Sequence, residues 1–247
     1  MFKGQLIACG TNAKTIKGDG EEFLTAIMYL APFTNVPGFN ACAMAALAAC
    51  DKACLFKAGR GAFTNVEAAR VRKTVLFRDD RKRFMEMLVS DLEKFVRYAK
   101  RKTVIPCVRP NGTSDILWEC IACERDGVEY RNIMEAFPEI QFYDYTKIAK
   151  RFNTRLPDNY SLTLSYSEAS DKYVDYIAPH IYGTNNNVAV VFRDKATLAR
   201  YMQSGFLGRP VIDGDKTDLR FTDPMGVVVG LYAKGPARKD DTGFVVD

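Results

Sequence analysis

The chain has 247 residues, of which 47% are hydrophobic and 26% are charged, and its formal net charge is +5. This composition is typical of a globular protein and excludes a disordered or collagen-like chain. Neither the first residues nor any later apolar run has the length expected of a signal peptide or a membrane span. We therefore expect a cytoplasmic protein with no membrane partner.

The numbers of cysteines and histidines argue against several classes of protein. The chain has seven cysteines, and its only histidine is His180. An odd number of cysteines without a secretion signal argues against a disulfide framework. A single histidine argues against histidine-rich zinc hydrolases, di-iron centres and Ser-His-Asp hydrolases.

Short apolar runs alternate with longer amphipathic stretches along the chain. The predicted strands are residues 23–30, 103–109, 140–143, 160–164, 188–192 and 227–231. The predicted helices are residues 67–73, 79–101, 132–137, 146–151, 170–177 and 195–203. The helix at 79–101 has the clearest pattern, because its apolar residues recur at helical spacing.

This alternation of strands and helices predicts parallel βαβ units. We expect a single α/β domain over residues 1–247, built as a partial or complete TIM-like barrel with a cysteine loop after an early strand. Val188–Phe192 is almost wholly apolar, so it should lie in the middle of at least five parallel strands. The tail at 220–247 is expected to form a hairpin, because Asp223, Pro224 and Gly226 are turn residues. Trp118 is expected in the core.

Polar residues follow three successive predicted strands. In parallel βα folds, functional side chains gather at the carboxyl ends of the strands. We expect six of them to line one cavity for a small-molecule ligand: Asn111, Asp115, Asp144, Lys147, Ser167 and Glu168. Lys147 would pair with a carboxylate or phosphate, whereas Asp115 or Glu168 would accept from an amine or a ribose hydroxyl. For any one of these residues taken alone, turn formation or helix capping is the favoured explanation.

The least ordinary feature is a group of three cysteines, Cys42, Cys50 and Cys54, directly after the first strong strand. Thiolates are soft ligands that suit zinc, copper(I) and iron–sulfur clusters. A structural zinc site needs a fourth cysteine or histidine close by, and this segment contains none. Three thiolates on one loop can instead reach three corners of a four-iron (4Fe–4S) or three-iron (3Fe–4S) cluster.

An alternative without metal stays open for the same segment. The alanine-rich run at 41–50 is also compatible with a packed helix in which cysteine acts as a small hydrophobic residue. Cys9 and Cys107 are not expected to bind metal. Cys120 and Cys123 are interpreted as core cysteines or as a weak C-x2-C pair.

A three-cysteine loop after an early strand of a βα-repeat protein is similar to that of radical S-adenosylmethionine (β/α)-barrel proteins. The resemblance implies that S-adenosylmethionine would occupy the open iron. The spacing here is C-x7-C-x3-C rather than C-x3-C-x2-C, and Ala53 precedes the last cysteine instead of an aromatic residue. The sequence PNGTSD at 110–115 stands where that group has a Gly-Gly-Glu stretch.

Longer segments carry a second resemblance, which covers nearly all of the chain. They include YLAP at 29–32, AGRG at 58–61, RPNGTSDILWE at 109–119, FPEIQFYDYTK at 137–147 and VIDGDKTDLRF at 211–221. In these segments the chain resembles uncharacterised phage proteins of the gene product 88 type. The resemblance implies host-cell cytoplasm as the location, and it implies no specific activity.

Three functions therefore stay open. The first is an iron–sulfur protein with a redox or structural cluster. The second is a radical S-adenosylmethionine-like enzyme acting on a nucleotide or nucleic acid. The third is a metal-free nucleic-acid-binding or host-takeover protein, favoured by the basic residues at 70–83. Whether the chain is an enzyme is left open.

Overall fold

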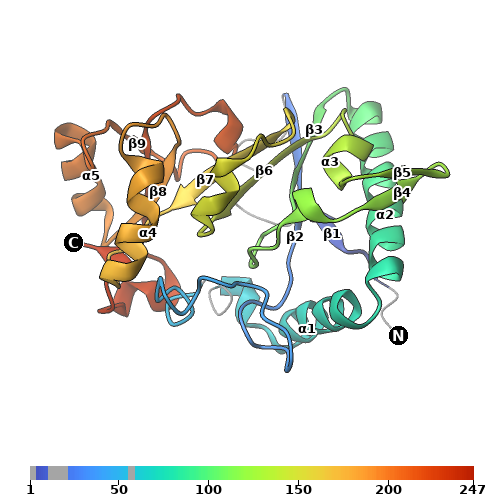
Figure 1. The fold of residues 1–247 in the computed structure, drawn as a ribbon, viewed down its shortest axis with the longest axis horizontal. Helices are drawn as coiled ribbons and strands as arrows, with labels where there is room; N and C mark the ends of the chain where they lie inside the picture. Colours follow the sequence, from blue (N-terminus) through green and yellow to red (C-terminus); the bar gives the residue numbers. More distant parts are fainter. Residues whose placement is uncertain (1–3, 11–21, 55–58) are drawn as a thin grey trace.

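The computed structural model describes residues 4–10, 22–54 and 59–247 (Figure 1). Most of its strands form one sheet in the order β1-β2-β3-β6-β7-β8-β10-β9, with β11 also paired to β8. Their bounds are β1 Ile7–Cys9, β2 Phe23–Met28, β3 Ile105–Arg109, β6 Gln141–Thr146, β7 Tyr160–Ser165, β8 Val188–Phe192, β9 Val211–Asp213, β10 Val228–Tyr232 and β11 Val245–Val246. Every pairing in this sheet is parallel except that of β1 with β2.

Helices and short turns connect these strands. The α-helices are α1 Thr64–Asp79, α2 Arg81–Lys102, α3 Ile133–Ala136, α4 Asp171–Ile181 and α5 Lys195–Ser204. The 3₁₀ turns used below are η3 Trp118–Cys120, η4 Ala149–Asn153, η5 Arg220–Thr222 and η6 Gly235–Lys239. A small hairpin of β4 Cys123–Arg125 and β5 Val128–Tyr130 lies outside the main sheet. No helix in the described part of the chain has both the length and the apolar character to cross a membrane.

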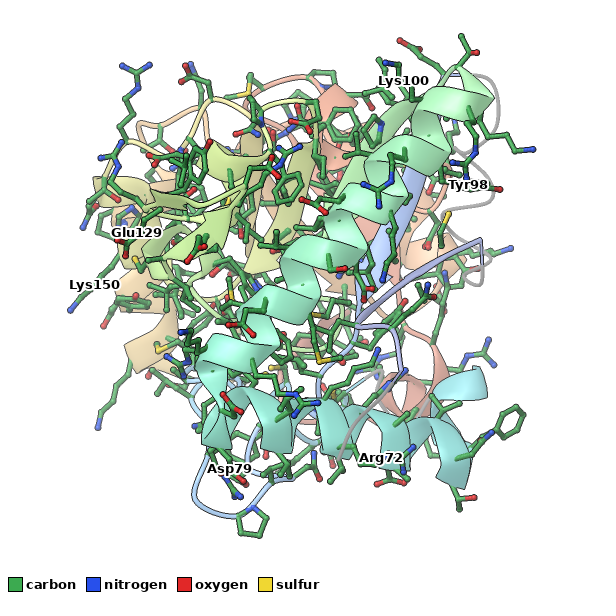
Figure 2. All side chains as sticks on the ribbon, turned by 90° about the vertical axis from the view of Figure 1, so that its right-hand side faces the viewer. Arg72, Asp79, Tyr98, Lys100, Glu129 and Lys150 are labelled. Carbon is green, nitrogen blue, oxygen red and sulfur yellow. The ribbon has the colours of Figure 1, made fainter. Side chains whose placement is uncertain are left out.

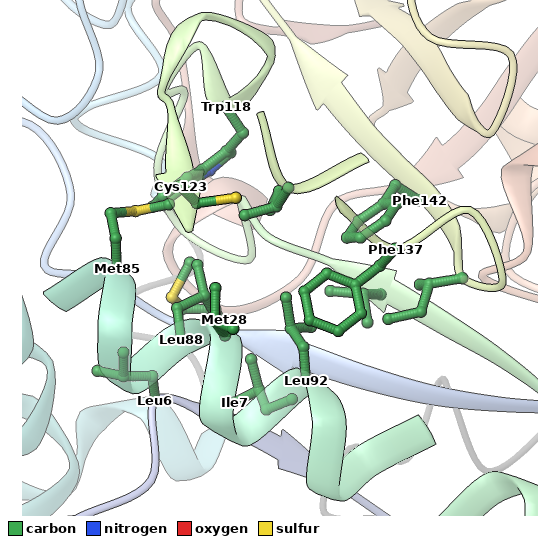
Figure 3. Packing of buried hydrophobic residues seen from close by; sticks show 14 of the residues in the cluster. Leu6, Ile7, Met28, Met85, Leu88, Leu92, Trp118, Cys123, Phe137 and Phe142 are labelled. Carbon is green, nitrogen blue, oxygen red and sulfur yellow. The ribbon is translucent and has the colours of Figure 1, made fainter. Parts of the chain in front are cut away.

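Helix α2 covers one end of the sheet. Its apolar positions recur every three or four residues, so they form one stripe, and Leu88 and Leu92 on that stripe are buried. They pack with Met28 and Phe142 of the sheet in one hydrophobic cluster, and Figure 3 shows these side chains gathered between helix and strands. Each such side chain contributes roughly 1.5–3 kcal/mol by leaving water. Trp118 belongs to the same cluster, as expected from the sequence.

Helices α4 and α5 cover the other end of the sheet on the same face. Ile177 of α4 and Leu198 of α5 pack in one cluster with Val190 of β8 and Val228 of β10. In Figure 1 these two helices lie at the left and α2 lies at the right, with the sheet between them. The predicted position of Val188–Phe192 is confirmed, since β8 is buried between β7 and β10.

The opposite face of the sheet is covered by the segment between β9 and β10. Side chains alternate between the faces of a strand, so Tyr143 faces away from the cluster that holds Phe142. The Tyr143 ring contacts Phe221 at 5.6 Å between ring centroids, and its hydroxyl lies 3.2 Å from Asp218 Oδ2. This segment begins at Gly214. A side chain would not fit there, because a Cβ would lie 2.5 Å from Val229 Cγ1.

These features correct two predictions. A complete barrel is wrong, because in the described residues the sheet is open, with β1 and β9 at its edges. The segment after β9 crosses one face of the sheet instead of forming another helix on the outside of a barrel. The alternation of strand and helix therefore ends after β9. The tail hairpin is also wrong: the residues before the expected turn form η5 rather than a strand, and β10 after it pairs in parallel with β8 and β9.

Two predicted element boundaries also change. The helix expected at 146–151 begins later, because Thr146 is still the last residue of β6. It is also shorter than expected, since the segment forms only the 3₁₀ turn η4. The strand expected at 140–143 is correspondingly longer at its carboxyl end.

Candidate functional site

The carboxyl ends of the parallel strands open into a cavity of about 240 Å³. Its walls come from the ends of β3, β6, β7, β8 and β10, and its remaining lining comes from residues 42–54, 111–115 and 234–244. In Figure 1 the light-blue segment that carries residues 42–54 runs along the lower edge of the sheet, between α1 and the red C-terminal segment. Strand ends are the usual place for a ligand site in an open parallel sheet.

Cys42, Cys50 and Cys54 all line this cavity. Their segment is a succession of turns and contains no regular helix, so the packed helix considered for residues 41–50 is not present. Asn40 Oδ1 accepts a hydrogen bond from the N–H of Cys42 at 2.8 Å, and Cys42 Sγ lies 3.8 Å from the carbonyl oxygen of Thr113.

Two contacts tie the cysteine segment to the strand ends. The N–H of Asp115 donates to the carbonyl oxygen of Ala41 at 2.8 Å. The hydroxyl of Ser167 donates to the carbonyl oxygen of Ala48 at 2.8 Å and is fully buried. Ser167 therefore does not line the cavity, but it holds the segment that does.

Burial governs the ionisation of two of the thiols. Desolvation raises the pKa of Cys42 to about 12, against a partly opposing backbone hydrogen bond. Desolvation also raises the pKa of Cys50, and the nearby Lys147 ammonium lowers that pKa in part. Without a bound metal both groups stay protonated near neutral pH, which makes them poor nucleophiles. The arrangement therefore does not favour a cysteine nucleophile.

The metal-binding capacity of the described side chains is limited as they stand. Within residues 4–10, 22–54 and 59–247 there is no group of three or more Cys, His, Asp or Glu side chains that would hold a metal ion. The other cysteines are not among the lining residues: Cys9 is half-buried, Cys107 and Cys123 are buried, and Cys120 is exposed. The three cavity cysteines share one space but do not form a ready site for a single ion.

The six predicted polar residues divide into two groups. Asn111, Asp115 and Lys147 line the cavity, whereas Asp144, Ser167 and Glu168 are not among its lining residues. Asp144 lies inside β6 and is fully buried, and Glu168 is exposed. The Glu168 carboxylate accepts a hydrogen bond from the Tyr166 hydroxyl at 3.2 Å.

Asp144 belongs to a buried network that shapes one cavity wall. It accepts hydrogen bonds from the N–H of Asn111 at 2.9 Å and from the Tyr160 hydroxyl at 2.9 Å. Asn111 Oδ1 in turn accepts from Ser114, from the N–H of Ile116 and from the indole of Trp118. These bonds fix the loop between β3 and η3.

Arg151 extends this network to the acidic residues of the same loop. Its guanidinium binds both carboxylate oxygens of Glu119 at 2.7 Å and lies 3.3 Å from Asp115 Oδ1. A two-point arginine–carboxylate pair in a buried position fixes orientation as well as charge. Burial raises the pKa of Asp115, and the Arg151 charge opposes that rise. Arg151 was not among the site residues predicted from the sequence.

Arg109 and Lys234 also line the cavity and were missed. Lys234 follows β10, so the rule that selected residues after other strands would have found it. Arg109 ends β3, and its position inside the strand hid it.

The basic stretch at 70–83 is partly used inside the molecule. Arg70 lies over the Tyr29 ring at 4.9 Å, and Lys73 Nζ donates to the carbonyl oxygen of Leu6 at 2.7 Å. Arg81 lies over the Phe77 ring at 4.4 Å. Figure 2 shows α1 along the lower edge with Arg72 and Asp79, and the upper end of α2 with Tyr98 and Lys100. Several cations that favoured nucleic-acid binding therefore have structural contacts.

Comparison with known proteins completes this description. A sequence model described as gene product 88 matches residues 5–247. The chain belongs to the gene product 88 family. No curated protein and no solved structure matches it.

Proposed function

We propose that this gene product 88 protein is an iron–sulfur protein whose cluster is bound by Cys42, Cys50 and Cys54. One observation carries the proposal: these three thiols come from one turn-rich segment and line the same cavity at the strand ends. Thiolate sulfur is the ligand that iron–sulfur clusters use most.

The shape of a cluster suits this arrangement better than a single zinc ion does. A cube of four irons binds its thiolates at separate corners, so the sulfur ligands stand farther apart than the ligands of one ion. Cysteine side chains in a segment of turns can also rotate toward a common centre without breaking a helix. Three protein ligands would leave one iron open, or the centre would contain three irons.

Charge balance supports the same site. Buried thiolates are costly unless a cation or a metal compensates their charge. Cluster binding would deprotonate the thiols and supply that compensation, which couples metal binding to folding. Lys147 adds a positive charge near Cys50.

The cluster would serve electron transfer or structure. A radical S-adenosylmethionine-like enzyme is a second candidate, because the cavity continues from the cysteines to Asn111 and Asp115 and has room for a small molecule. Titration of the reduced, cluster-loaded protein with S-adenosylmethionine tests this second function. Release of deoxyadenosine would support it, and an unchanged cluster spectrum would contradict it.

Anaerobic reconstitution tests the primary proposal. The protein is incubated with iron and sulfide, and bound iron, bound sulfide and the absorption spectrum are measured. We expect Cys42→Ser, Cys50→Ser and Cys54→Ser each to lose most of the iron. Cys120→Ser is the matched control, because Cys120 is exposed and should keep it.

Circular dichroism of each variant separates loss of the cluster from loss of folding. The proposal is wrong if the unaltered protein binds no iron under these conditions. It is also wrong if all three folded variants keep the full amount.

A further inference from the structure

The cavity is lined by more cationic than anionic side chains. Three cationic side chains line it, Arg109, Lys147 and Lys234, against one carboxylate, Asp115. A cavity with an excess of cationic side chains favours a ligand that carries negative charge. The three cations differ in whether a carboxylate of the protein already pairs with them.

Two of the three cations already have carboxylate partners. Arg109 Nη1 lies 3.3 Å from Asp218 Oδ2, and its guanidinium lies over the Tyr145 ring. Lys234 Nζ lies 2.5 Å from Asp215 Oδ1. Both charges are therefore compensated inside the protein.

Lys147 differs from them. Its ammonium donates to the hydroxyl of Ser165 at 2.5 Å and lies 4.9 Å from the centre of the Phe244 ring. In the described part of the chain, no carboxylate lies within ion-pair distance of it. Asp115 is bound by the backbone N–H of Lys147, by Thr146 and by Arg151, and not by the Lys147 ammonium.

Strand ends beside this lysine line the cavity. Strand β7 ends at Ser165, opposite Ala189 of β8, and β11 pairs with β8 farther along, at Val191 and Phe192. Ser165 and Val191 both line the cavity near the ends of their strands. Crevices outside the carboxyl ends of parallel strands are common ligand sites.

We infer that Lys147 and Ser165 bind the anionic group of a small organic ligand, a carboxylate or a phosphate. The apolar part of that ligand lies against Phe244, Val191 and Leu231, which line the same cavity. A cavity of about 240 Å³ has room for a small organic anion. This inference goes beyond the proposed cluster and does not depend on it.

Isothermal titration of the iron-free, full-length protein with three probes tests the inference. Benzoate and phenyl phosphate carry the two anionic groups on an apolar ring, and benzyl alcohol is the neutral counterpart. We expect at least one anion to bind and benzyl alcohol to bind at least tenfold more weakly. Comparison of the two anions identifies the preferred group.

Variants of the lysine make the test specific. Lys147→Met should weaken anion binding at least tenfold, and Lys147→Arg should keep most of it. Lys150→Met is the matched control, because Lys150 is exposed and lies outside the cavity lining, so its binding should be unchanged. Benzyl alcohol binding as tightly as the anions would overturn the inference. Unchanged anion binding in Lys147→Met would also overturn it.

Iron content separates this inference from the proposed function. If Lys147→Met keeps anion binding but fails to load iron, Lys147 is the counter-ion of the thiolates and the ligand inference is wrong. If it loads iron normally and loses anion binding, the inference is supported whatever the cluster does. If Lys147→Met does not fold, the folded Lys147→Gln variant gives the same comparison.

Discussion

The carboxylate of Asp115 accepts a hydrogen bond from the backbone N–H of Lys147 at 2.8 Å. The N–H of Asp115 binds Ala41 on its other side. One residue thus joins the loop after β3, the loop after β6 and the start of the cysteine segment. Since all three segments line the cavity, Asp115 acts as the junction of its walls.

Asp115→Ala is expected to lower the free energy of unfolding by about 1–3 kcal/mol, because it leaves the buried N–H of Lys147 without a partner. Urea unfolding measures the change. Asp158→Ala is the control: Asp158 pairs with Arg155 at the surface, and such pairs contribute about 0–1 kcal/mol. Equal effects of the two substitutions would contradict the role of Asp115 as a junction.

Ser167→Ala is expected to loosen the cysteine segment. The buried carbonyl oxygen of Ala48 would lose its hydroxyl partner, which costs about 1–3 kcal/mol. We expect less iron retained after reconstitution and dialysis than in the unaltered protein. Ser204→Ala provides the comparison, because Ser204 is exposed at the end of α5. Full iron retention by the Ser167 variant would show that this tether does not support the site.

Leu92→Ala is expected to lower the free energy of unfolding by about 2–5 kcal/mol, since it removes a fully buried side chain and leaves a cavity. Leu117→Ala is a matched control, because Leu117 is 38% exposed and should lose much less. Denaturant unfolding of both variants gives the comparison. A difference below about 1 kcal/mol would mean that α2 contributes little to the core.

The sequence predicted the features that depend on local pattern. Apolar runs located the parallel strands, and the helical spacing in 79–101 located the buried stripe of α2. Both signals are strong because burial on a regular element repeats with the period of that element. The placement of three cysteines after the first parallel strand of the sheet also indicated that they lie near the strand ends.

Features that depend on distant parts of the chain were not predictable in this way. β6 ends at Thr146 rather than at Tyr143, and this difference placed Asp144 in a loop when it lies within a strand. Asn111 and Tyr160 cover the carboxylate of Asp144, so Asp144 is fully buried and is not among the residues that line the cavity. The segment from Gly214 to Phe221 gives no local sign that it covers a sheet face.

The stability of the protein is expected to depend on pH through Asp144. Burial raises the pKa of Asp144 to about 7, although Arg109 and Arg151 oppose that rise. An aspartate in an unfolded chain has a pKa of about 3.9, so between about pH 4 and pH 7 the folded protein binds the extra proton. The contribution of Asp144 to the free energy of unfolding is therefore fully present below about pH 4, and it is lost as the pH rises toward 7. The loss amounts to at most about 1.4 kcal/mol per pH unit.

Asp144→Asn cannot titrate, so the difference in unfolding free energy between the unaltered protein and this variant should depend on pH across that interval. Urea unfolding at several pH values measures it. Asp158→Asn makes the same substitution at an exposed position and is the control. A pH profile for Asp144→Asn that runs parallel to that of the unaltered protein would show that Asp144 ionises in the folded state as it does in water.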